Sequence, residues 1–432
     1  MRVAGVALFA AGLLVVPLAS AATFGRPAEI PLVRAPVALA VADPTQDGSG
    51  DLVLANATGP TLTVLPGKAD GSFGPPRDLG ARSVPGSFAV ADLDNDGSDD
   101  LAVAEKGEIA IYLSADGTFV RKSVLSAPGV SSVRAADLDL DGNSDLIAAA
   151  ATRSIVTVFM GTDENTFLPG REYPTANPPA AILAVDLNGD ELPDVVTGGN
   201  ALTVLFNNGD GTLSSPVQVG GPSEVLALAS GDLDGDGDVD LAVAHRPNFV
   251  SVELNSGDGQ FPNEGTYAVG ATPDAIGVAF LDGDDTLDIA AANRGTNDVS
   301  ILPGTGEGRF SEQSRLKVGK APVAFTVEDL NGDGVDDLVT ANRLGRSVTV
   351  LLNGADAPQP VVCLVPAVAH RKVAVARRLV GTANCRVAAV RRKFSGGVRK
   401  GRVISIAPVP GTRRPVGTPV TLLVSRGPKK KR

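Results

Sequence analysis

Aspartates recur at a fixed spacing in seven short segments of the chain, in the pattern of a metal-binding loop. The fullest version reads D-x-[DN]-x-D-G-x-x-D, with side-chain oxygens at the first, third, fifth and ninth positions and glycine at the sixth. Calcium takes roughly six to eight oxygen ligands on a flexible loop, whereas magnesium resists all-protein cages. The spacing therefore favours several bound calcium ions, with magnesium as the weaker alternative.

The seven loops, numbered here in chain order, are not equivalent. Loop four keeps its side-chain oxygens but has Glu191 where glycine is expected. Loop one has Thr45 at the third position and loop six has Phe280 at the first, so we expect these two to be weak or empty. The complete sets are Asp92, Asp94, Asp96 and Asp100; Asp137, Asp139, Asp141 and Asp145; Asp232, Asp234, Asp236 and Asp240; and Asp329, Asn331, Asp333 and Asp337. The others are Asp186, Asn188, Asp190 and Asp194 in loop four, Asp43, Asp47 and Asp51 in loop one, and Asp282, Asp284 and Asp288 in loop six.

Two other interpretations of these loops are less favourable. An EF-hand needs glutamate at the twelfth position and a following helix, but loop two has Val103 there, inside an apolar strand. A merely solvated turn would hold carboxylates about 4 Å apart, where each pair repels by roughly 4 kcal/mol at an effective dielectric constant of about 20. Seven such loops without a cation would carry a heavy energetic penalty.

The acidic segments belong to a longer repeat that defines the fold. They begin at residues 43, 92, 137, 186, 232, 280 and 329, a period of 45 to 49 residues. In each repeat an alternating apolar strand precedes the acidic loop, a second strand follows it, and a third strand ends in a tight turn before a more polar fourth strand. Four antiparallel strands at this spacing make one blade, which predicts an all-β, seven-bladed β-propeller. An open solenoid, or a ring of six or eight blades, is the alternative.

The seventh repeat supplies only three of its four strands. It ends at VTVLLNGADA (348–357), whereas FGRPAEIPL (24–32) resembles FGPPRDLG (73–80), the fourth strand of the first repeat. We therefore expect the N-terminal strand to complete the last blade and close the ring. Closure would remove the open sheet edges at which chains pair with one another.

The acidic loops and the flanking segments LAVA and NNGDGTL resemble the FG-GAP/VCBS repeats of integrin-α-type propellers, over roughly residues 24–353. The resemblance implies a calcium role for the aspartates named above. It leaves the ligand open, whether protein or glycan, because that superfamily includes adhesion proteins, bacterial surface proteins and a few polysaccharide-lyase-like enzymes.

The end of the chain has the opposite charge. Residues 361–432 contain 18 Lys and Arg and no Asp or Glu, whereas residues 1–360 contain 20 basic and 49 acidic residues. This asymmetry indicates two modules with different partners. The simplest interpretation is a solvated basic surface, and the sharper one is attraction to anionic polymers of a bacterial cell wall.

The pattern of the basic module is a strand, a short helix and three further strands, with Val373, Ala376, Leu379, Val380 and Ala383 on one face of the helix. Segments such as KGRVIS and GTPVTLLVSRG resemble a single PASTA domain over about residues 364–427, which implies an association with peptidoglycan. In an exported protein, Cys363 and Cys385 are expected to form a disulfide.

The first 21 residues have an early arginine, an apolar run and the small-residue exit Ala19-Ser20-Ala21, the pattern of a cleaved signal peptide. An uncleaved membrane anchor is the alternative; no other segment of spanning length occurs. We expect a signal peptide over 1–21, the propeller over 22–353, a linker over 354–360, the PASTA-like domain over 361–427 and a basic tail over 428–432. The mature protein would be secreted or held at the cell surface, where the tail PKKKR would not meet nucleic acid.

No catalytic constellation stands out in the sequence. His245 occupies the strand-end position that Asn56, Asn293 and Asn342 hold in other repeats, and His370 lies in the basic module. Motifs for a serine nucleophile, a zinc protease or a phosphate loop are missing. We therefore expect a non-catalytic binding or adhesion protein, and an extracellular carbohydrate-active enzyme of the lyase type remains the alternative.

Overall fold

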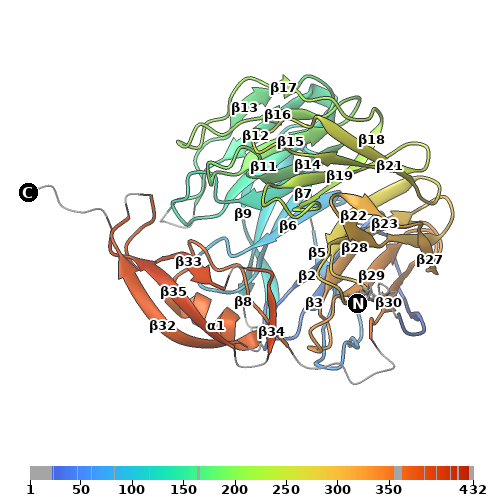
Figure 1. The fold of residues 1–432 in the computed structure, drawn as a ribbon. Coiled ribbons are helices and arrows are strands. Elements are labelled where there is room, and N and C mark those ends of the chain that lie inside the picture. The colour runs from blue at the N-terminus through green and yellow to red at the C-terminus, as the bar shows by residue number, and fades with distance from the viewer. Residues whose placement is uncertain are drawn as a thin grey trace, which may run out of the picture.

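The computed structural model describes residue 22, residues 24–354 except 46, 60, 82, 116 and 163–165, and residues 362–427 except 384, 396, 409 and 416–417. The expected signal peptide, nearly all of the expected linker and the basic tail lie outside the described residues. Strands dominate what is described, and the α-helix among these residues is α1 (Val373–Thr382), near the C-terminus (Figure 1).

Seven antiparallel sheets of four strands account for most of the described residues before 355. Sheets one to four contain β2 (Pro36–Ala42), β3 (Asp51–Asn56), β4 (Thr61–Leu65) and β5 (Arg77–Gly80); β6 (Ser87–Ala91), β7 (Asp100–Glu105), β8 (Glu108–Ala115) and β9 (Thr118–Ser126); β10 (Ser132–Ala136), β11 (Asp145–Ala150), β12 (Ile155–Phe159) and β13 (Arg171–Pro174); and β14 (Ala181–Val185), β15 (Asp194–Gly198), β16 (Thr203–Leu205) and β17 (Val217–Gln218). Sheets five to seven contain β18 (Val225–Gly231), β19 (Asp240–His245), β20 (Phe249–Leu254) and β21 (Asn263–Ala268); β22 (Pro273–Ala279), β23 (Asp288–Asn293), β24 (Asp298–Leu302) and β27 (Ser314–Lys317); and β28 (Pro322–Glu328), β29 (Asp337–Asn342), β30 (Ser347–Leu351) and β1 (Ala28–Pro31). A short ribbon of β25 (Gly304–Gly306) and β26 (Arg309–Phe310) and a 3₁₀ turn at Ala151–Arg153 complete these elements.

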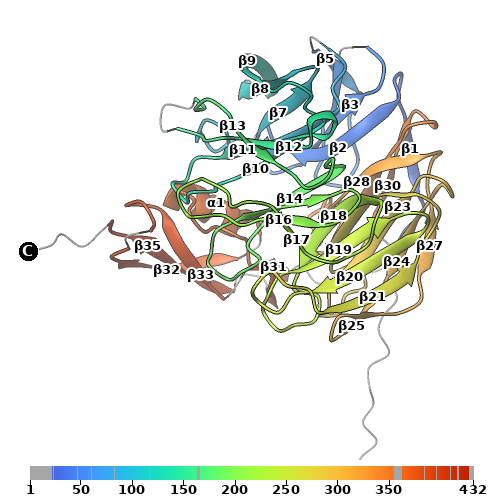
Figure 2. The same cartoon turned by 90° about the horizontal axis from the view of Figure 1, so that it is seen from above.

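The second strand of each sheet is the most buried, and its composition explains why. In β7, which reads DLAVAE, all six residues are buried. Small and β-branched side chains on both faces let neighbouring sheets pack closely against this strand. A hydrophobic cluster fills the space between each sheet and the next, including one between sheets seven and one. Figure 2 shows the sheets grouped side by side around a common centre.

The N-terminal strand β1 pairs with β30 and lies at the outer edge of sheet seven. The pairing places Ala28 opposite Val350 and Pro31 opposite Ser347. Beyond the strand, a bridge joins Phe24 to Asn353, and the Ser347 hydroxyl donates to Glu29 over 2.6 Å. The first and last parts of this unit are therefore held in one sheet, as the sequence predicted for the segment 24–32.

The basic C-terminal domain has its own core. Its elements are β31 (Val362–Leu364), α1, β32 (Arg386–Lys393), β33 (Val403–Ala407), β34 (Arg413–Pro415) and β35 (Pro419–Ser425), with a mixed sheet in the order β32-β35-β33. The predicted face of α1 packs on this sheet, and a disulfide joins Cys363 to Cys385, as expected. Closing a loop of 22 residues stabilises such a small domain by roughly 3 kcal/mol in the chain-entropy model.

Candidate metal loops and the basic domain

The aspartate at the ninth position anchors the acidic loop in repeats two to seven. Asp145 begins β11 and is fully buried. Its Oδ2 accepts the N–H of Leu138 over 2.7 Å, and its Oδ1 accepts the N–H of Gly161, also over 2.7 Å. Asp100, Asp194, Asp240, Asp288 and Asp337 make the same pair of bonds to the start of their loop and to the end of the third strand. The predicted ligand is therefore also a structural bridge, and each oxygen keeps a lone pair for a cation.

The preceding aspartates fold the loop around a common point. In loop two, Asp92 accepts the N–H of Gly97 over 3.1 Å and Asp96 accepts that of Ser98 over 2.7 Å. Such local bonds hold the acidic side chains turned inward. Carboxylate oxygens of three residues lie within 4.8 Å of one another in loops two, three and five: Asp92, Asp94 and Asp96; Asp137, Asp139 and Asp145; Asp232, Asp234 and Asp240. Loops four and seven have asparagine at the third position and so fewer carboxylates.

Two buried oxygens test whether these residues fit a cation. Oδ1 of Asp92 and Oδ1 of Asp137, both at the first position of their loops, are buried and have no hydrogen-bond partner. A buried acceptor without a partner costs about 1–3 kcal/mol, and more when it is charged. A divalent cation at the centre of each loop would satisfy both oxygens. The donor set of loops two and three therefore fits calcium.

Burial and like charges disfavour the ionised form of the ninth-position aspartates. Burial raises the pKa of Asp100 to about 7 and that of Asp145 to about 8, although two backbone N–H groups oppose the shift at each residue. Neighbouring aspartates in the same loop raise both pKa values further. A bound cation would reverse this balance, because a nearby positive charge favours the ionised carboxylate.

The loops predicted to be imperfect show the local effect of their substitutions. In loop four, Glu191 takes the positive φ of 70° that glycine adopts in other loops, while its N–H still donates to Asp186 over 2.7 Å. In loop one, the Thr45 hydroxyl bonds to Asp43 over 3.1 Å. In loop six, which lacks the first ligand, Oδ2 of Asp282 is buried without a partner.

Three asparagines that link neighbouring sheets were not anticipated from the sequence. Each stands at the end of a third strand and donates its amide to the backbone carbonyl of the leucine in the previous acidic loop. Asn207 bonds to Leu138 over 2.8 Å, and Asn255 to Leu187 over 2.8 Å. Asn353 makes the equivalent bond to Leu281. The signal in the sequence is the recurrence of asparagine at this point of repeats four, five and seven.

His245 has a partner on the neighbouring strand. Its Nε2 lies 3.0 Å from the Ser251 hydroxyl on the next strand. Asn342 makes the equivalent contact, donating its amide to the Thr349 hydroxyl over 2.8 Å. The histidine thus replaces an asparagine of the repeat, as the sequence comparison of strand ends indicated.

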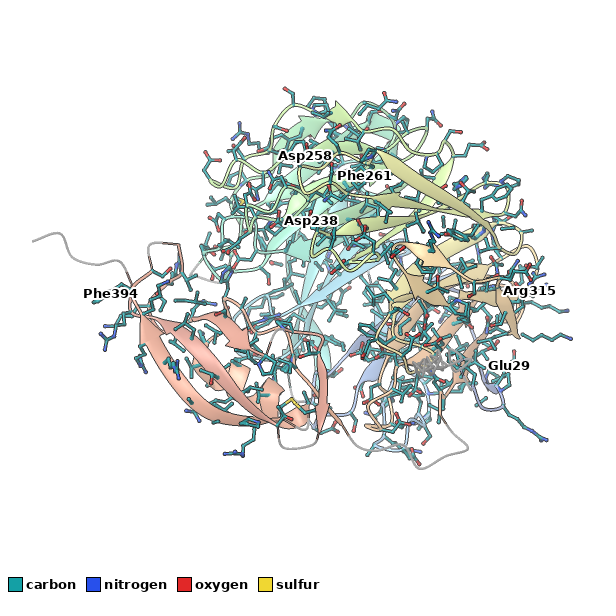
Figure 3. The ribbon with its side chains drawn as sticks, viewed as in Figure 1. Glu29, Asp238, Asp258, Phe261, Arg315 and Phe394 are labelled. Carbon is teal, nitrogen blue, oxygen red and sulfur yellow. A yellow bond between two sulfur atoms is a disulfide. The ribbon has the colours of Figure 1, made fainter. Side chains whose placement is uncertain are left out.

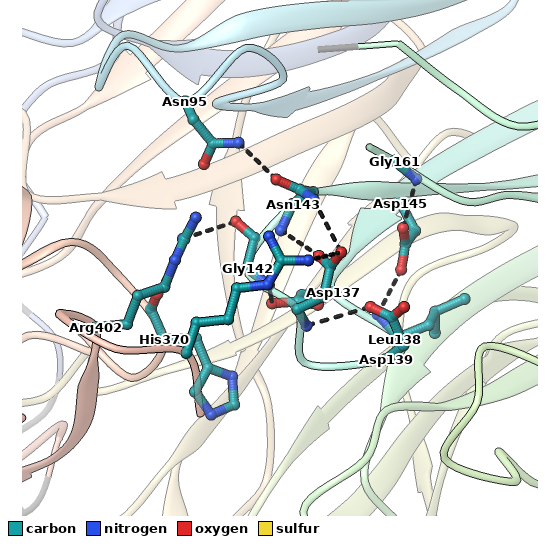
Figure 4. A network of polar contacts seen from close by, with 12 residues as sticks. Asn95, Asp137, Leu138, Asp139, Gly142, Asn143, Asp145, Gly161, His370 and Arg402 are labelled. Carbon is teal, nitrogen blue, oxygen red and sulfur yellow. Dashed lines mark hydrogen bonds and ion pairs between the residues drawn. The ribbon is translucent and has the colours of Figure 1, made fainter. Parts of the chain in front are cut away.

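The basic domain lies directly on loops two and three, and Figure 4 shows its Arg402 against Gly142 of loop three. Arg402 donates to the carbonyl of Gly142 over 2.8 Å, and Arg399 pairs with Asp141 over 3.0 Å. On loop two, Lys372 donates to the carbonyl of Asn95 over 3.0 Å and Arg378 to that of Gly97. A Cβ on Gly142 would stand 2.3 Å from the Arg402 guanidinium, so a side chain there would displace the end of Arg402.

Comparison with known families gives the repeat its name. FG-GAP-like repeat matches cover 43–103, 92–148, 137–197, 186–243, 232–282 and 281–340. Each match runs from one acidic loop into the next. The chain belongs to the FG-GAP-like repeat family. A PASTA domain matches residues 364–426. Both resemblances drawn from the motifs are therefore confirmed, and the basic domain of this FG-GAP repeat protein is its PASTA domain.

Solved structures support a propeller-like fold for the FG-GAP repeats. BBS1N, crystallised in complex with ARL6DN, is 13% identical with a TM-score of 0.59, over 79% of this chain and 99% of that one. A lectin from Agrocybe aegerita, described as recognising non-reducing terminal N-acetylglucosamine, is 20% identical with a TM-score of 0.51, over 66% of this chain and 81% of that one. No curated protein matches the chain. Within the described residues, no helix has the length and apolarity to span a membrane.

Proposed function

We propose that this FG-GAP repeat protein is a secreted or cell-surface binding protein: a closed, seven-bladed, calcium-stabilised propeller that presents ligand loops, with a PASTA domain that holds the cell wall. The two units correspond to residues 22–353 and 361–427. The joint presence of FG-GAP-like repeats and a PASTA domain carries the proposal, because both suggest binding or adhesion. A non-catalytic role is consistent with the structural bonds of His245 and of the ninth-position aspartates.

Three observations support closure of the ring at seven blades. The first strands contact one another in sequence, and β28 of sheet seven contacts β2 of sheet one. A central cavity of about 350 Å³ is lined by first-strand residues of all seven sheets. The N-terminal strand β1, which precedes β2 of sheet one in the chain, pairs with β30 at the outer edge of sheet seven.

Calcium is the cation we propose for loops two, three and five, with loops four and seven as further sites. The support comes from the converging carboxylates and from the partnerless oxygens of Asp92 and Asp137. When bound, calcium would supply positive charge that neutralises the loop and fixes its shape. The chain's own contribution is the ninth-position aspartate, which holds the loop in place through the backbone.

The basic residues of the PASTA domain form two groups. Lys372, Arg378, Arg399 and Arg402 contact the acidic loops of the propeller. The end of β32 carries Arg391, Arg392 and Lys393, all of which are exposed. Figure 3 places the half-exposed Phe394, next in the chain, on the side of the domain away from the sheets. We propose that this outer surface meets peptidoglycan or an anionic wall polymer.

Co-sedimentation with purified, insoluble peptidoglycan tests the proposed wall contact. The chain from residue 22 onward should pellet with the wall at about 0.15 M salt, where screening beyond roughly 8 Å removes diffuse attraction. Replacing Arg391, Arg392 and Lys393 by glutamine should move most of the protein to the supernatant, because these side chains would contact the polymer directly.

A matched variant controls for net charge. Replacing Arg77, Lys106 and Lys317, which are exposed on the propeller, by glutamine removes the same three charges and should leave pelleting unchanged. Failure of the unmodified chain to pellet would refute wall binding. Equal losses in both variants would mean that net charge alone, and no PASTA surface, is responsible.

A further inference from the structure

Three arginines stand at equivalent positions in consecutive sheets, at the end of the sheets opposite the acidic loops. Arg246, Arg294 and Arg343 each follow the last residue of a second strand and open the turn to the third. Because the strands are antiparallel, these turns lie at the far end of each blade from the calcium loops. Sheet two has Lys106 at this position, and sheets one, three and four have Ala57, Ala151 and Gly199.

The backbone fixes the three arginines in the same way. Their N–H groups donate to the carbonyls of Glu224, Thr272 and Ala321, over 3.3, 2.9 and 2.9 Å. Each of these acceptors precedes a first strand and has a positive φ of about 55°. A positive φ is uncommon for non-glycine residues, so its recurrence at one position of three repeats indicates that the fold constrains the backbone there. The fold therefore fixes the backbone position of all three arginines.

The charges around these three arginines do not cancel. Asp274 faces all three arginines, and they lower its pKa against the larger effect of burial, which raises it. Its carboxylate is engaged by Arg294 in an ion pair. Arg246 and Arg343 act on Asp274 only as more distant charges. Within the described part of the chain, neither of them forms a side-chain hydrogen bond or ion pair, and Lys320 forms none either. Arg294, Arg343 and Lys320 therefore leave an excess of positive charge.

A cavity of about 560 Å³ opens between the arginines of sheets six and seven, and three basic side chains line it. Arg294, Lys320 and Arg343 line it together with Thr272 and Asn297. The Oδ1 of Asn297 already accepts the N–H of Ala321 over 2.8 Å, so its amide nitrogen is left to donate into the cavity. Leu344, which is 76% exposed, forms an apolar rim.

We propose that this cavity binds an acidic sugar residue, through a carboxylate or phosphate group held by Arg343 and Lys320. Guanidinium and ammonium groups form strong charge-assisted bonds with both anions. Asn297 and Thr272 then face the sugar hydroxyls, and Leu344 covers an apolar face of the ring. The volume suits one or two sugar units, within the usual range of ligand sites. This site is independent of the calcium loops and of the PASTA domain.

Isothermal titration of the full chain tests the site with three probes: glucuronate, glucose 6-phosphate and neutral glucose, in calcium and about 0.15 M salt. Both acidic sugars should bind and glucose should not. The double variant Lys320→Ala/Arg343→Ala should bind them at least about tenfold more weakly, since each lost charged bond is worth roughly one factor of ten or more. Both side chains are exposed, so the variant should keep the unmodified melting temperature.

The matched control is Lys68→Ala/Arg309→Ala, which removes two exposed cations from turns at the acidic-loop end of the sheets. Its affinity for the acidic sugars should equal that of the unmodified chain. The proposal is overturned if glucose binds as tightly as glucuronate, or if neither acidic sugar binds. It is also overturned if Lys320→Ala/Arg343→Ala binds normally, which would move the anions to another basic surface such as the PASTA domain.

Discussion

A chain that begins at Val33, and so lacks β1, is expected to lose about 4 kcal/mol of stability and to aggregate. The deletion exposes the partly buried Phe24, Ile30 and Leu32 contacts of sheet seven, each worth roughly 1–2 kcal/mol at half burial. It also uncovers β30, whose five residues are all buried in the intact protein. An open, apolar edge of this kind pairs readily with other chains.

The measurement is thermal unfolding with light scattering on the shortened and the complete mature chains. A fall of roughly 10 °C in melting temperature corresponds to the estimated loss in a domain of this size. Two point variants refine the test. Ile30→Asp should reproduce much of the effect, whereas Ala28→Asp, exposed on the same strand, should be nearly neutral. A shortened chain that melts normally and stays monodisperse would mean that β1 does not hold the ring together.

Asp145→Ala is expected to cost about 3 kcal/mol even when no calcium is present. The change leaves two backbone N–H groups, those of Leu138 and Gly161, without their acceptor in a buried place. Each unsatisfied group costs about 1–3 kcal/mol. Removing the buried carboxylate, whose pKa burial raises to about 8, returns part of this loss. The net effect should still be large, because the residue connects two strands and the loop between them.

Asp139→Ala in the same loop is the matched control. Asp139 lies with Asp137 and Asp145 in the proposed calcium cluster but does not bridge two strands. Urea unfolding in the presence of a chelator should therefore separate the two variants, with Asp139→Ala close to the unmodified chain. With calcium added, both should fall below it. Equal stabilities of the two variants in chelator would show that the ninth-position aspartate is only a ligand.

The repeat could be predicted from the sequence because each of its signals lies within a short segment. Strand alternation, glycine turns and acidic spacing recur within each repeat, so seven loops and the completing strand at 24–32 could be identified without coordinates. The helix face of the PASTA domain followed from the same kind of periodicity, with Ala376 and Val380 buried as expected. The pairing of Cys363 with Cys385 followed from the count of two cysteines.

Contacts between distant segments were beyond the sequence pattern. The bond from Asn255 to Leu187 joins residues 68 apart, and the pair Arg399–Asp141 joins residues 258 apart. The asparagine bond recurs in three repeats, at separations of 69, 68 and 72 residues, but the sequence does not show which backbone carbonyl the amide reaches. The Arg399–Asp141 pair has no spacing that repeats along the chain. The double role of Asp145 was hidden for another reason: a ligand and a backbone acceptor look the same in sequence. The arc of Arg246, Arg294 and Arg343 could have been found by aligning strand ends, but its meaning depends on the cavity beside it.

Calcium-dependent melting is the most direct test of the proposed calcium-stabilised propeller. The mature chain should melt at a higher temperature as free calcium rises through about 0.1–1 mM, the range of extracellular modules. Each site occupied at one hundred times its dissociation constant adds about 2.7 kcal/mol, so several sites should give a shift of many degrees. Excess chelator should reverse the shift, and magnesium at the same concentration should give much less. A melting temperature that neither calcium nor chelator moves would contradict the account.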